Sequence, residues 1–123
     1  MPRVDTRGRL GEFGEEAAAN YLARAGHQIV ARRWRCRRGE LDIVTQDGQS
    51  LVFVEVRTRR GALAGSPEES VNATKRARLV QLAYSYLAAS SHSGEWRIDV
   101  VAVEVDRGGR VARINHIPHA VGE

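Results

Sequence analysis

Two short apolar runs rich in β-branched residues, Leu41–Thr45 and Leu51–Thr58, lie on either side of the tetrapeptide Gln-Asp-Gly-Gln. An Asp-Gly dipeptide between alternating apolar segments is typical of a tight hairpin turn. The sequence therefore predicts a β-hairpin over Gly39–Arg60, with Asp47 and Gly48 at the turn. Both faces of this hairpin carry apolar residues, which indicates a central position in a sheet that is covered on both sides.

Two segments outside the hairpin have the apolar spacing of amphipathic helices. The first is Arg9–Ala25, and Gly26 follows it as a C-terminal stop. The second begins at the Ser-Pro-Glu-Glu sequence, which has the composition of a helix start, and covers Ser66–Ala89. A loop is expected before it, at Arg59–Pro67.

Three further segments have the composition of β-strands, namely His27–Cys36, Trp96–Val105 and Val111–Ile117. The long connection through the second helix permits a parallel crossover between strands. We therefore expect a single α/β domain over residues 1–123, with a mixed sheet flanked by helices. Residues 1–8 are expected to form a flexible basic arm, and residues 118–123 a tail.

The composition is that of a soluble globular protein, with 42% hydrophobic and 28% charged residues. No apolar run approaches the ~20 residues that span a bilayer, and the start of the chain lacks the apolar segment of a secretory signal. We therefore expect a cytoplasmic protein that does not contact membranes. The single cysteine excludes an internal disulfide and a cysteine-based zinc site.

The charge is distributed unevenly along a chain whose net charge is +4. Residues 1–38 carry nine arginines against four acids, whereas Glu40–Glu55 contains four acids and no basic residue. An acidic pocket in a basic surround suits a metal site that lies against a phosphate backbone. Arginine outnumbers lysine eighteen to one, however, and genome base composition can also produce this bias.

The acids of the hairpin are expected to lie close together. With a two-residue turn at Asp-Gly, Glu40 faces Glu55 and Asp42 faces Phe53, so these side chains share one face. The other face is apolar throughout, with Leu41, Ile43, Val52, Val54 and Val56. Three carboxylates at the end of a covered face are unfavourable unless a cation lies between them, and oxygen ligands suit Mg²⁺ or Mn²⁺. A loop longer by one residue would move Glu55 to the face opposite Asp42.

Ordinary ion pairs are the alternative explanation for these acids. They could be neutralised by arginines alone, with Arg57, Arg59, Arg35 and Arg37 as the available partners. The hairpin by itself favours neither interpretation. Another acid, Asp99 in the strand Trp96–Val105, is expected to be the buried partner of an arginine rather than a site residue.

Each helix contributes one polar residue that could reach the hairpin. Glu15 lies at the edge of the apolar arc of the first helix, whereas Glu12 and Glu16 project toward solvent. Lys75, the single lysine of the chain, lies in the centre of the apolar stripe of the second helix. Desolvation and the helix dipole both disfavour this placement, which predicts an anionic partner. Alternatively, Glu15 pairs with an arginine and the ammonium group of Lys75 extends out to solvent.

The motifs GEFGEEAAANYL, WRCRRGELDIV, LVFVEVRTR and RIDVV, with the helix entry that carries Lys75, resemble the YraN family of small bacterial proteins in order and spacing. Proteins of this family are regarded as candidate endonucleases of the PD-(D/E)xK nuclease superfamily and are likened to archaeal Holliday-junction resolvases. The resemblance covers Arg9–Val103. It implies a restriction-endonuclease-like fold with an αβββαβ core.

The resemblance also implies roles for individual residues. Asp42 matches the aspartate that begins the metal site, Glu55 matches the acid of the (D/E)xK element, and Glu15 matches the helix glutamate that completes the site. Arg57 stands where this element has lysine. Because arginine is always protonated, it can only orient the substrate and stabilise charge. Water activation would then depend on the metal or on Lys75; alternatively, activity has weakened and a binding fold remains.

We therefore expect a metal-dependent endonuclease that hydrolyses DNA phosphodiester bonds, with branched or recombination and repair intermediates as substrates of a resolvase-like role. Mg²⁺ or Mn²⁺ would be held by four acids, Asp42, Glu55, Glu15 and Glu40. Two cations would face the scissile phosphate, Arg57 and Lys75. The DNA backbone would be bound by six arginines, Arg33, Arg35, Arg37, Arg38, Arg59 and Arg60. A resolvase-like role would also require a symmetric homodimer.

Two other functions fit the same sequence. The first is a non-catalytic DNA-binding or scaffold module that retains a nuclease fold, in which the acids form salt bridges. The second is a partner-binding protein unrelated to nucleic acid. The first predicts no metal binding, and the second predicts no salt-dependent affinity for DNA.

Overall fold

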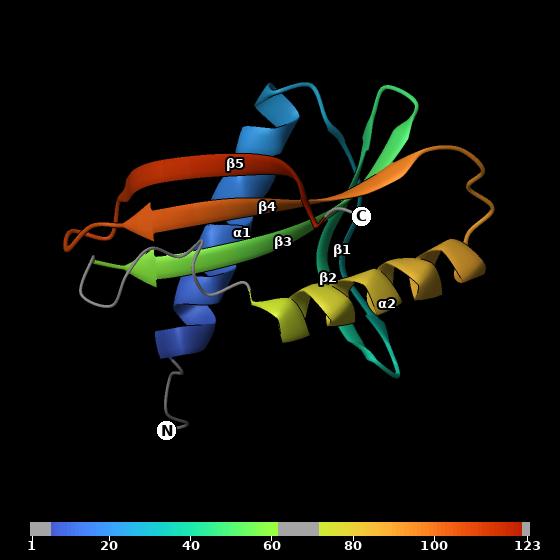
Figure 1. Cartoon of the computed structure of the whole chain (residues 1–123). Coiled ribbons are helices and arrows are strands. Elements are labelled where there is room, and N and C mark those ends of the chain that lie inside the picture. Colours follow the sequence, from blue (N-terminus) through green and yellow to red (C-terminus); the bar gives the residue numbers. More distant parts are fainter. Residues whose placement is uncertain (1–5, 62–71, 122–123) are drawn as a thin grey trace.

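The computed structural model describes residues 6–61 and 72–121 of the 123-residue chain. Within these residues, two helices and five strands follow one another along the chain (Figure 1). In order, these elements are α1 (Thr6–Arg24), β1 (Gln28–Cys36), β2 (Gly39–Asp47), β3 (Ser50–Arg60), α2 (Ala73–Ala89), β4 (Trp96–Val105) and β5 (Val111–Val121). In the described part of the chain, neither helix has the length and hydropathy of a membrane-spanning segment.

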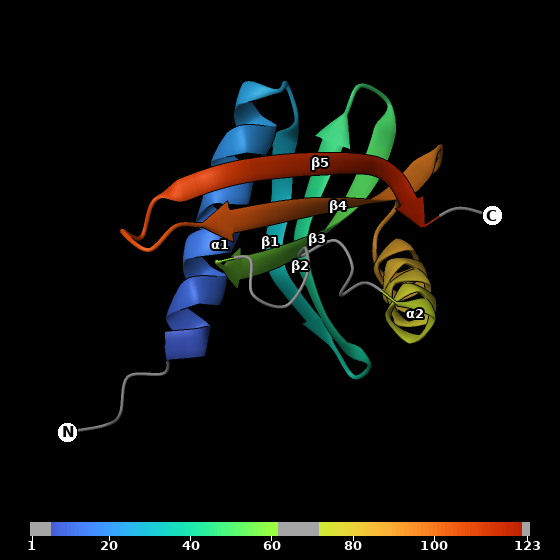
Figure 2. The ribbon, with the colours of Figure 1, turned by 60° about the vertical axis from the view of Figure 1, so that its left-hand side comes forward.

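The five strands form one mixed sheet in the order β1-β2-β3-β4-β5. β3 and β4 are parallel, and the other neighbours are antiparallel. A parallel pair needs a crossover connection, and α2 lies within it. The two helices cover opposite faces of the sheet (Figure 2). The expected α/β class, with a restriction-endonuclease-like αβββαβ core flanked by helices, is confirmed.

The apolar residues divide into one core on each face of the sheet. Under α1, buried alanines and Leu22 pack against strand residues that include Ile43, Val54 and Val101. Under α2, Leu79 and Leu82 pack with a second set of strand residues, Leu41, Val44, Leu51, Phe53 and Ile98. Burial on both faces explains why the central strands have apolar residues at successive positions.

The turn of the central hairpin lies one residue later than expected. Asp47 pairs with Ser50, so the turn residues are Gly48 and Gln49. Gly48 has a φ of 61°, which a primed two-residue turn requires at its first position and which glycine adopts without strain. The register therefore differs from the predicted one by two residues. Because side chains alternate with a period of two, this shift leaves each residue of β3 on its predicted face.

β2 and β3 separate near the start of β2. Their pairing ends at Ile43 and Val54. The prediction that Leu41 and Ile43 share a face is wrong, since Leu41 packs in the α2-side core and Ile43 in the α1-side core. The regular alternation of β2 is therefore interrupted at Asp42, which lies between them.

Both ends of the domain are more regular than the sequence predicted. α1 begins at Thr6 rather than Arg9, so residues 6–8 of the expected flexible arm are helical, and residues 1–5 lie outside the described residues. β5 continues to Val121, so the expected tail is strand up to that residue. Pairing with β4 extends this strand, because Ile98 pairs with Val121.

The end of β3 and the start of α2 both lie later in the chain than predicted. β3 continues to Arg60, so Arg59 and Arg60 belong to a strand rather than a loop. α2 begins at Ala73, where the side chain of Asn72 caps the helix by accepting a hydrogen bond from the backbone N–H of Lys75. The predicted helix start at Ser66 lies outside the described residues.

Candidate active site

Asp42 and Glu55 meet at the point where β2 leaves β3. The carboxylate of Asp42 accepts a hydrogen bond of 2.8 Å from the backbone N–H of Val56. It also forms a hydrogen bond with the carboxyl group of Glu55. The two acids that the hairpin pattern placed on one face therefore lie side by side, although their register differs from the predicted one.

Burial and mutual repulsion perturb this pair of carboxyl groups. Burial, followed by the nearby charges of Glu55 and Glu15, raises the pKa of Asp42 to about 8. Burial also raises the pKa of Glu55 above its ordinary value. Two poorly hydrated carboxylates in contact cannot both ionise easily, so the pair retains a proton near neutral pH unless a cation replaces it.

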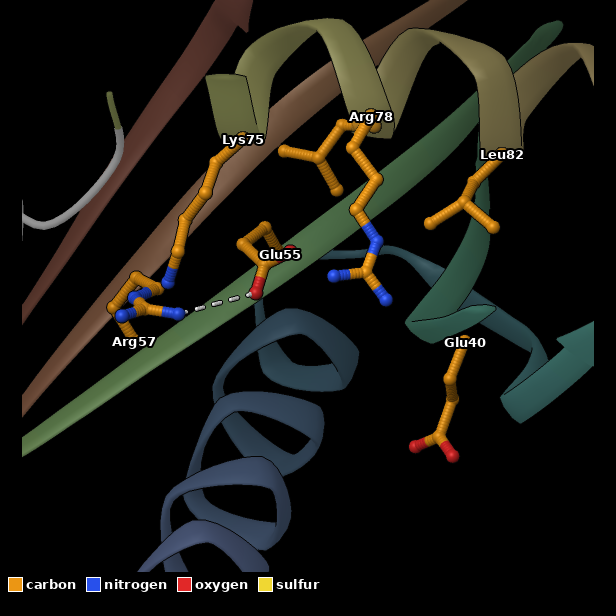
Figure 3. Close-up of a pocket in the computed structure, with 7 residues that line it drawn as sticks. Glu40, Glu55, Arg57, Lys75, Arg78 and Leu82 are labelled. Carbon is orange, nitrogen blue, oxygen red and sulfur yellow. Dashed lines mark ion pairs between the residues drawn. The ribbon is translucent and has the colours of Figure 1, made fainter. Parts of the chain in front are cut away.

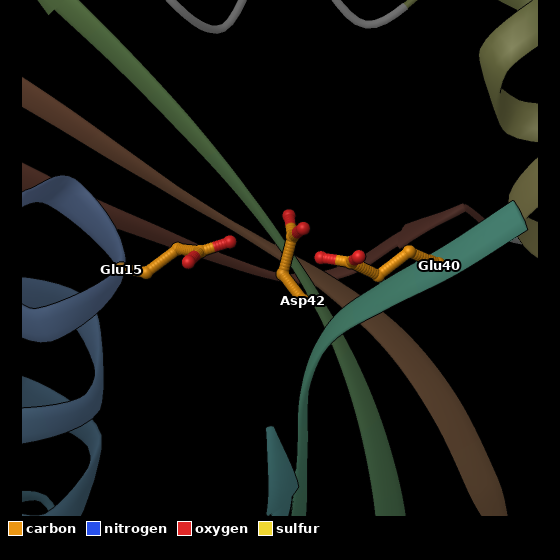
Figure 4. A group of neighbouring side chains, drawn as sticks. All are labelled: Glu15, Glu40 and Asp42. Carbon is orange, nitrogen blue, oxygen red and sulfur yellow. The ribbon is translucent and has the colours of Figure 1, made fainter. Parts of the chain in front are cut away.

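Two more acids surround Asp42. Carboxylate oxygens of Glu15, Glu40 and Asp42 all lie within 4.8 Å of one another. Glu15 reaches this point from α1 and Glu40 from the start of β2 (Figure 4). Carboxylate oxygens such as these suit Mg²⁺ or Mn²⁺; Glu55 contacts Asp42 but lies outside this group of three.

The glutamates of α1 divide as the helical periodicity predicted. The side chain of Glu15 is 13% exposed, whereas those of Glu12 and Glu16 are 65% and 62% exposed. Glu15 comes this close to the sheet because α1 crosses β3 at Gly14, where a Cβ atom would overlap the side chain of Thr58. A close approach that only glycine permits therefore brings Glu15 to the acids of the hairpin.

Arginines pair with three of the four acids. Nε of Arg33 donates to Glu15 at 3.0 Å, and Nε of Arg35 donates to Glu40 at 2.8 Å. The guanidinium of Arg57 lies 3.7 Å from the carboxylate of Glu55. The ion pairs of the alternative explanation are thus present for these three acids, while Asp42 is held by a backbone N–H and a carboxyl group.

Two pockets open on either side of Glu55 and Arg57. On the α2 side, a pocket of about 170 Å³ is lined by Glu40, Glu55, Arg57, Lys75, Arg78, Leu79 and Leu82 (Figure 3). On the α1 side, a pocket of about 350 Å³ is lined by Leu10, Gly11, Glu15, Asp42, Glu55, Val56, Arg57 and Thr58. Because the strands separate here, side chains from both helices reach the same acids.

Lys75 extends from α2 toward Glu55 and Arg57 (Figure 3). Burial lowers the pKa of Lys75, as do the neighbouring charges of Arg57 and Arg78, while Glu55 and Asp42 oppose this effect. The anions expected near this inward lysine are Glu55 and Asp42, but among the described residues neither forms an ion pair with it, and Arg57 perturbs its pKa more strongly than either. Because its pKa is lowered, a larger fraction of Lys75 than of an exposed lysine is neutral, and so able to accept a proton, at a given pH.

Arg78 is a pocket residue that was not among those predicted from the sequence. It lines the same pocket as Lys75, and its guanidinium lies so close to Gly39 that a Cβ atom there would be 2.6 Å from it. Residues three apart on a helix are neighbours, so the spacing from Lys75 was a signal that could have found it. Three cations thus converge on Glu55, since Arg57 lines this pocket as well.

The other arginines predicted to bind DNA lie around this site. Arg37 and Arg38 are exposed at the turn between β1 and β2, and Arg38 donates to Gln81 of α2 at 3.1 Å. Arg59 and Arg60 lie at the end of β3. Arg33 and Arg35 differ from these residues because their guanidinium groups are turned toward candidate metal ligands.

A separate polar cluster is buried away from these pockets, around Asp99. The carboxylate of Asp99 is fully buried and accepts hydrogen bonds of 3.0 Å from Arg97 and 3.1 Å from the backbone N–H of His119. Its second oxygen lies 2.7 Å from Nε2 of His116. The prediction that Asp99 is the buried partner of an arginine is confirmed.

Comparison with known proteins identifies relatives along most of the chain. The family described as "Uncharacterised protein family UPF0102" matches residues 14–103, which include all four candidate metal ligands. A UPF0102 protein of Roseiflexus castenholzii is 51% identical over 119 residues, or 95% of this chain and 96% of that protein. A UPF0102 protein of Pelotomaculum thermopropionicum is 49% identical over 118 residues, or 95% of this chain and 98% of that protein. The chain therefore belongs to the UPF0102 family, whose members are YraN-like.

Proposed function

We propose that this protein is a metal-dependent endonuclease of the PD-(D/E)xK superfamily that hydrolyses phosphodiester bonds in DNA. The observation that carries the proposal is the contact between the buried carboxyl groups of Asp42 and Glu55. Like charges held together in this way are stabilised by a divalent cation. The cations Arg57, Lys75 and Arg78 beside them suit a phosphate group.

The residues present fit Mg²⁺ or Mn²⁺. Asp42 and Glu55 would be the inner ligands, with Glu15 or Glu40 in support, and all the donors are carboxylate oxygens. When bound, such an ion lowers the pKa of a water ligand and offsets charge on a phosphate undergoing in-line attack. The raised pKa of Asp42 adds a condition, because this carboxyl group must lose its proton before it can serve as a ligand.

The neighbouring cations would divide two tasks between them. Arg57 keeps its proton at any relevant pH, so it would orient the scissile phosphate and stabilise negative charge on it. Lys75, whose pKa is lowered, could accept a proton from the attacking water at Nζ. This division would let the site operate with arginine in the position of the superfamily lysine.

The DNA backbone would lie across the basic surround of the site. Arg37 and Arg38 at the β1–β2 turn and Arg59 and Arg60 at the end of β3 would contact phosphates. The resemblance to resolvases favours branched or recombination and repair intermediates as substrates. That role would require a symmetric homodimer and a cytoplasmic location.

A titration with Mn²⁺ tests the proposal. Calorimetry should show binding to the parent protein and loss of binding in Asp42→Asn, while Glu16→Gln keeps it. Glu16 is a matched control because it lies on α1 and pairs with an arginine at 3.0 Å, as Glu15 does, but projects away from the site. Incubation of the same three proteins with linear, flapped and four-way DNA, with and without Mn²⁺, then measures hydrolysis. A parent protein that binds no Mn²⁺ would overturn the proposal.

A DNA-binding module without catalysis is the second candidate function. Two observations favour it, namely arginine at position 57 and the ion pairs that Arg33 and Arg35 form with Glu15 and Glu40. Such a module would bind DNA with an affinity that falls steeply with salt, yet would neither bind Mn²⁺ nor hydrolyse any of the three DNA substrates.

A further inference from the structure

Two arginines of β1 form ion pairs with the two glutamates that surround Asp42 in the candidate site. Arg33 pairs with Glu15 at 3.0 Å, and Arg35 pairs with Glu40 at 2.8 Å. Oxygens of the same two glutamates lie within 4.8 Å of each other and of Asp42. The guanidinium charges therefore neutralise the carboxylates that a divalent cation would also use.

The backbone of β1 is distorted where it brings Arg33 to this position. Arg32 pairs with Glu16 and Arg33 with Glu15, so two consecutive strand residues both contact α1. In a regular strand, neighbouring side chains leave on opposite faces. Arg33 has a φ of 52°, a left-handed conformation that is strained for a residue with a Cβ atom and that breaks this alternation. Backbone strain of this kind is concentrated at functional sites.

Both arginines retain access to solvent and hence to a ligand. The side chain of Arg33 is 42% exposed and that of Arg35 is 76% exposed. A carboxylate that ligates a divalent cation loses most of its attraction for a guanidinium group, because the cation already neutralises it. The released guanidinium is a planar group with several N–H donors, which matches the oxygens of a phosphate.

We propose that Arg33 and Arg35 are exchangeable counterions that couple metal binding to DNA binding. In the metal-free protein they pair with Glu15 and Glu40, and when a divalent cation takes these carboxylates they turn to the phosphates of bound DNA. This inference rests on the proposed function and adds a regulatory step to it. The coupling is reciprocal, so DNA strengthens metal binding by the same factor as metal strengthens DNA binding.

The affinity for Mn²⁺ without DNA provides the first test. Arg33→Ala and Arg35→Ala each remove a competitor of the cation and should raise the Mn²⁺ affinity about two- to fivefold, the range that an exposed ion pair accounts for. Arg32→Ala is the matched control, because Arg32 pairs at 3.0 Å with Glu16, which lies outside the candidate ligand set. Its Mn²⁺ affinity should be unchanged. A lower affinity in Arg33→Ala and Arg35→Ala would show that these arginines position the ligands, and would overturn the inference.

Binding of a short duplex provides the second test. Fluorescence anisotropy with and without Ca²⁺, an oxygen-preferring divalent ion, should show tighter DNA binding with the ion for the parent protein and for Arg32→Ala. The double variant Arg33→Ala, Arg35→Ala should lose this increase. If the parent binds Mn²⁺ through Asp42 but its DNA affinity is independent of metal, the coupling fails and the proposed nuclease stands. If the parent binds no Mn²⁺, both fail.

Discussion

Asp42 accepts a hydrogen bond of 2.8 Å from the backbone N–H of Val56, the residue that follows Glu55. The bond lies just beyond the last paired residues of β2 and β3, so a side chain provides the acceptor where the strand pairing has ended. The separation of the strands explains how two helices on opposite faces contribute to one site. Glu15 of α1 and Lys75 of α2 both lie close to the Asp42–Glu55 pair.

The stability of the metal-free protein should depend on pH through Asp42. The folded-state pKa of Asp42 is about 8, raised from 3.8. Protonation of Asp42 therefore contributes stability that is fully present below pH 3.8 and is lost as pH rises through 8. Asp42→Asn removes this loss and keeps an acceptor for the N–H of Val56. The variant should therefore be more stable than the parent at pH 8 by at least about 1 kcal/mol, the equivalent of one pKa unit, and the difference should shrink toward pH 5. Urea denaturation at pH 5, 6.5 and 8 measures this difference.

Two controls accompany this measurement. Glu16→Gln should show no comparable change with pH, because the side chain of Glu16 is 62% exposed and lies outside the group of candidate ligands. Saturating Mn²⁺ should stabilise the parent protein at pH 8 and leave Asp42→Asn unaffected. A difference between parent and Asp42→Asn that is constant from pH 5 to pH 8 would contradict the raised pKa.

The sequence predicted on which side of the sheet each site residue lies, but it predicted their exact partners less accurately. Apolar alternation and a two-residue turn predicted that Asp42 and Glu55 come together, and their carboxyl groups do meet, although the pairing of β2 with β3 ends at Ile43, next to Asp42. Helical periodicity likewise identified Glu15 and Lys75 as the inward polar residues of their helices. These features depend on local pattern, which the sequence carries directly.

The features that the sequence did not reveal depend on contacts between distant segments. The separation of β2 from β3 moves Leu41 to the α2 side of the sheet, and no local pattern in the sequence indicates it. The ion pair of Arg33 with Glu15 requires a left-handed backbone at an arginine, which no residue preference indicates. In the metal-free protein Arg33 is turned toward a candidate metal ligand, and its contact with DNA stays a prediction.

The crossing of α1 over β3 should be intolerant of any side chain at Gly14. Gly14→Ala would place a Cβ atom in overlap with Thr58 and should destabilise the protein by about 1–3 kcal/mol, the usual effect of overpacking. Gly11→Ala, on the same helix, meets nothing within 4 Å and should stabilise the protein by about 0.5–1 kcal/mol through helix propensity. Thermal and urea denaturation of both variants measure these opposite effects.

A second substitution identifies the cause of the Gly14→Ala effect. Thr58→Gly removes the atoms that the new Cβ would meet, so Gly14→Ala should cost less in the Thr58→Gly background than in the parent. A double-mutant cycle gives this coupling directly. Equal costs in the two backgrounds would show that steric overlap at Thr58 is not the reason for glycine at position 14.

The buried cluster at Asp99 should dominate the response of β4 and β5 to mutation. Asp99→Asn removes a charge that Arg97 and His116 face, and breaking one side of a buried ion pair costs about 3–5 kcal/mol. Glu104→Gln is the control on the same strand, because Glu104 pairs with Arg113 in a half-exposed position and should cost less than about 1 kcal/mol. Urea denaturation compares the two. Similar costs would contradict a structural role for the Asp99 cluster.

The rate of DNA hydrolysis should depend on the protonation state of the Lys75 amine. Because burial and nearby guanidinium groups lower the pKa of this lysine, a larger fraction of it is deprotonated at a given pH, and the rate should rise with pH through its titration. Lys75→Arg keeps the positive charge but cannot accept a proton, and should reduce kcat by about 10²–10⁴-fold, the usual contribution of a general base. Arg76→Ala, an exposed position next to it on α2, should retain the parent rate and pH profile. A Lys75→Arg variant with an unchanged rate and pH profile would assign proton acceptance to another group and leave Lys75 the role of a fixed charge beside Glu55.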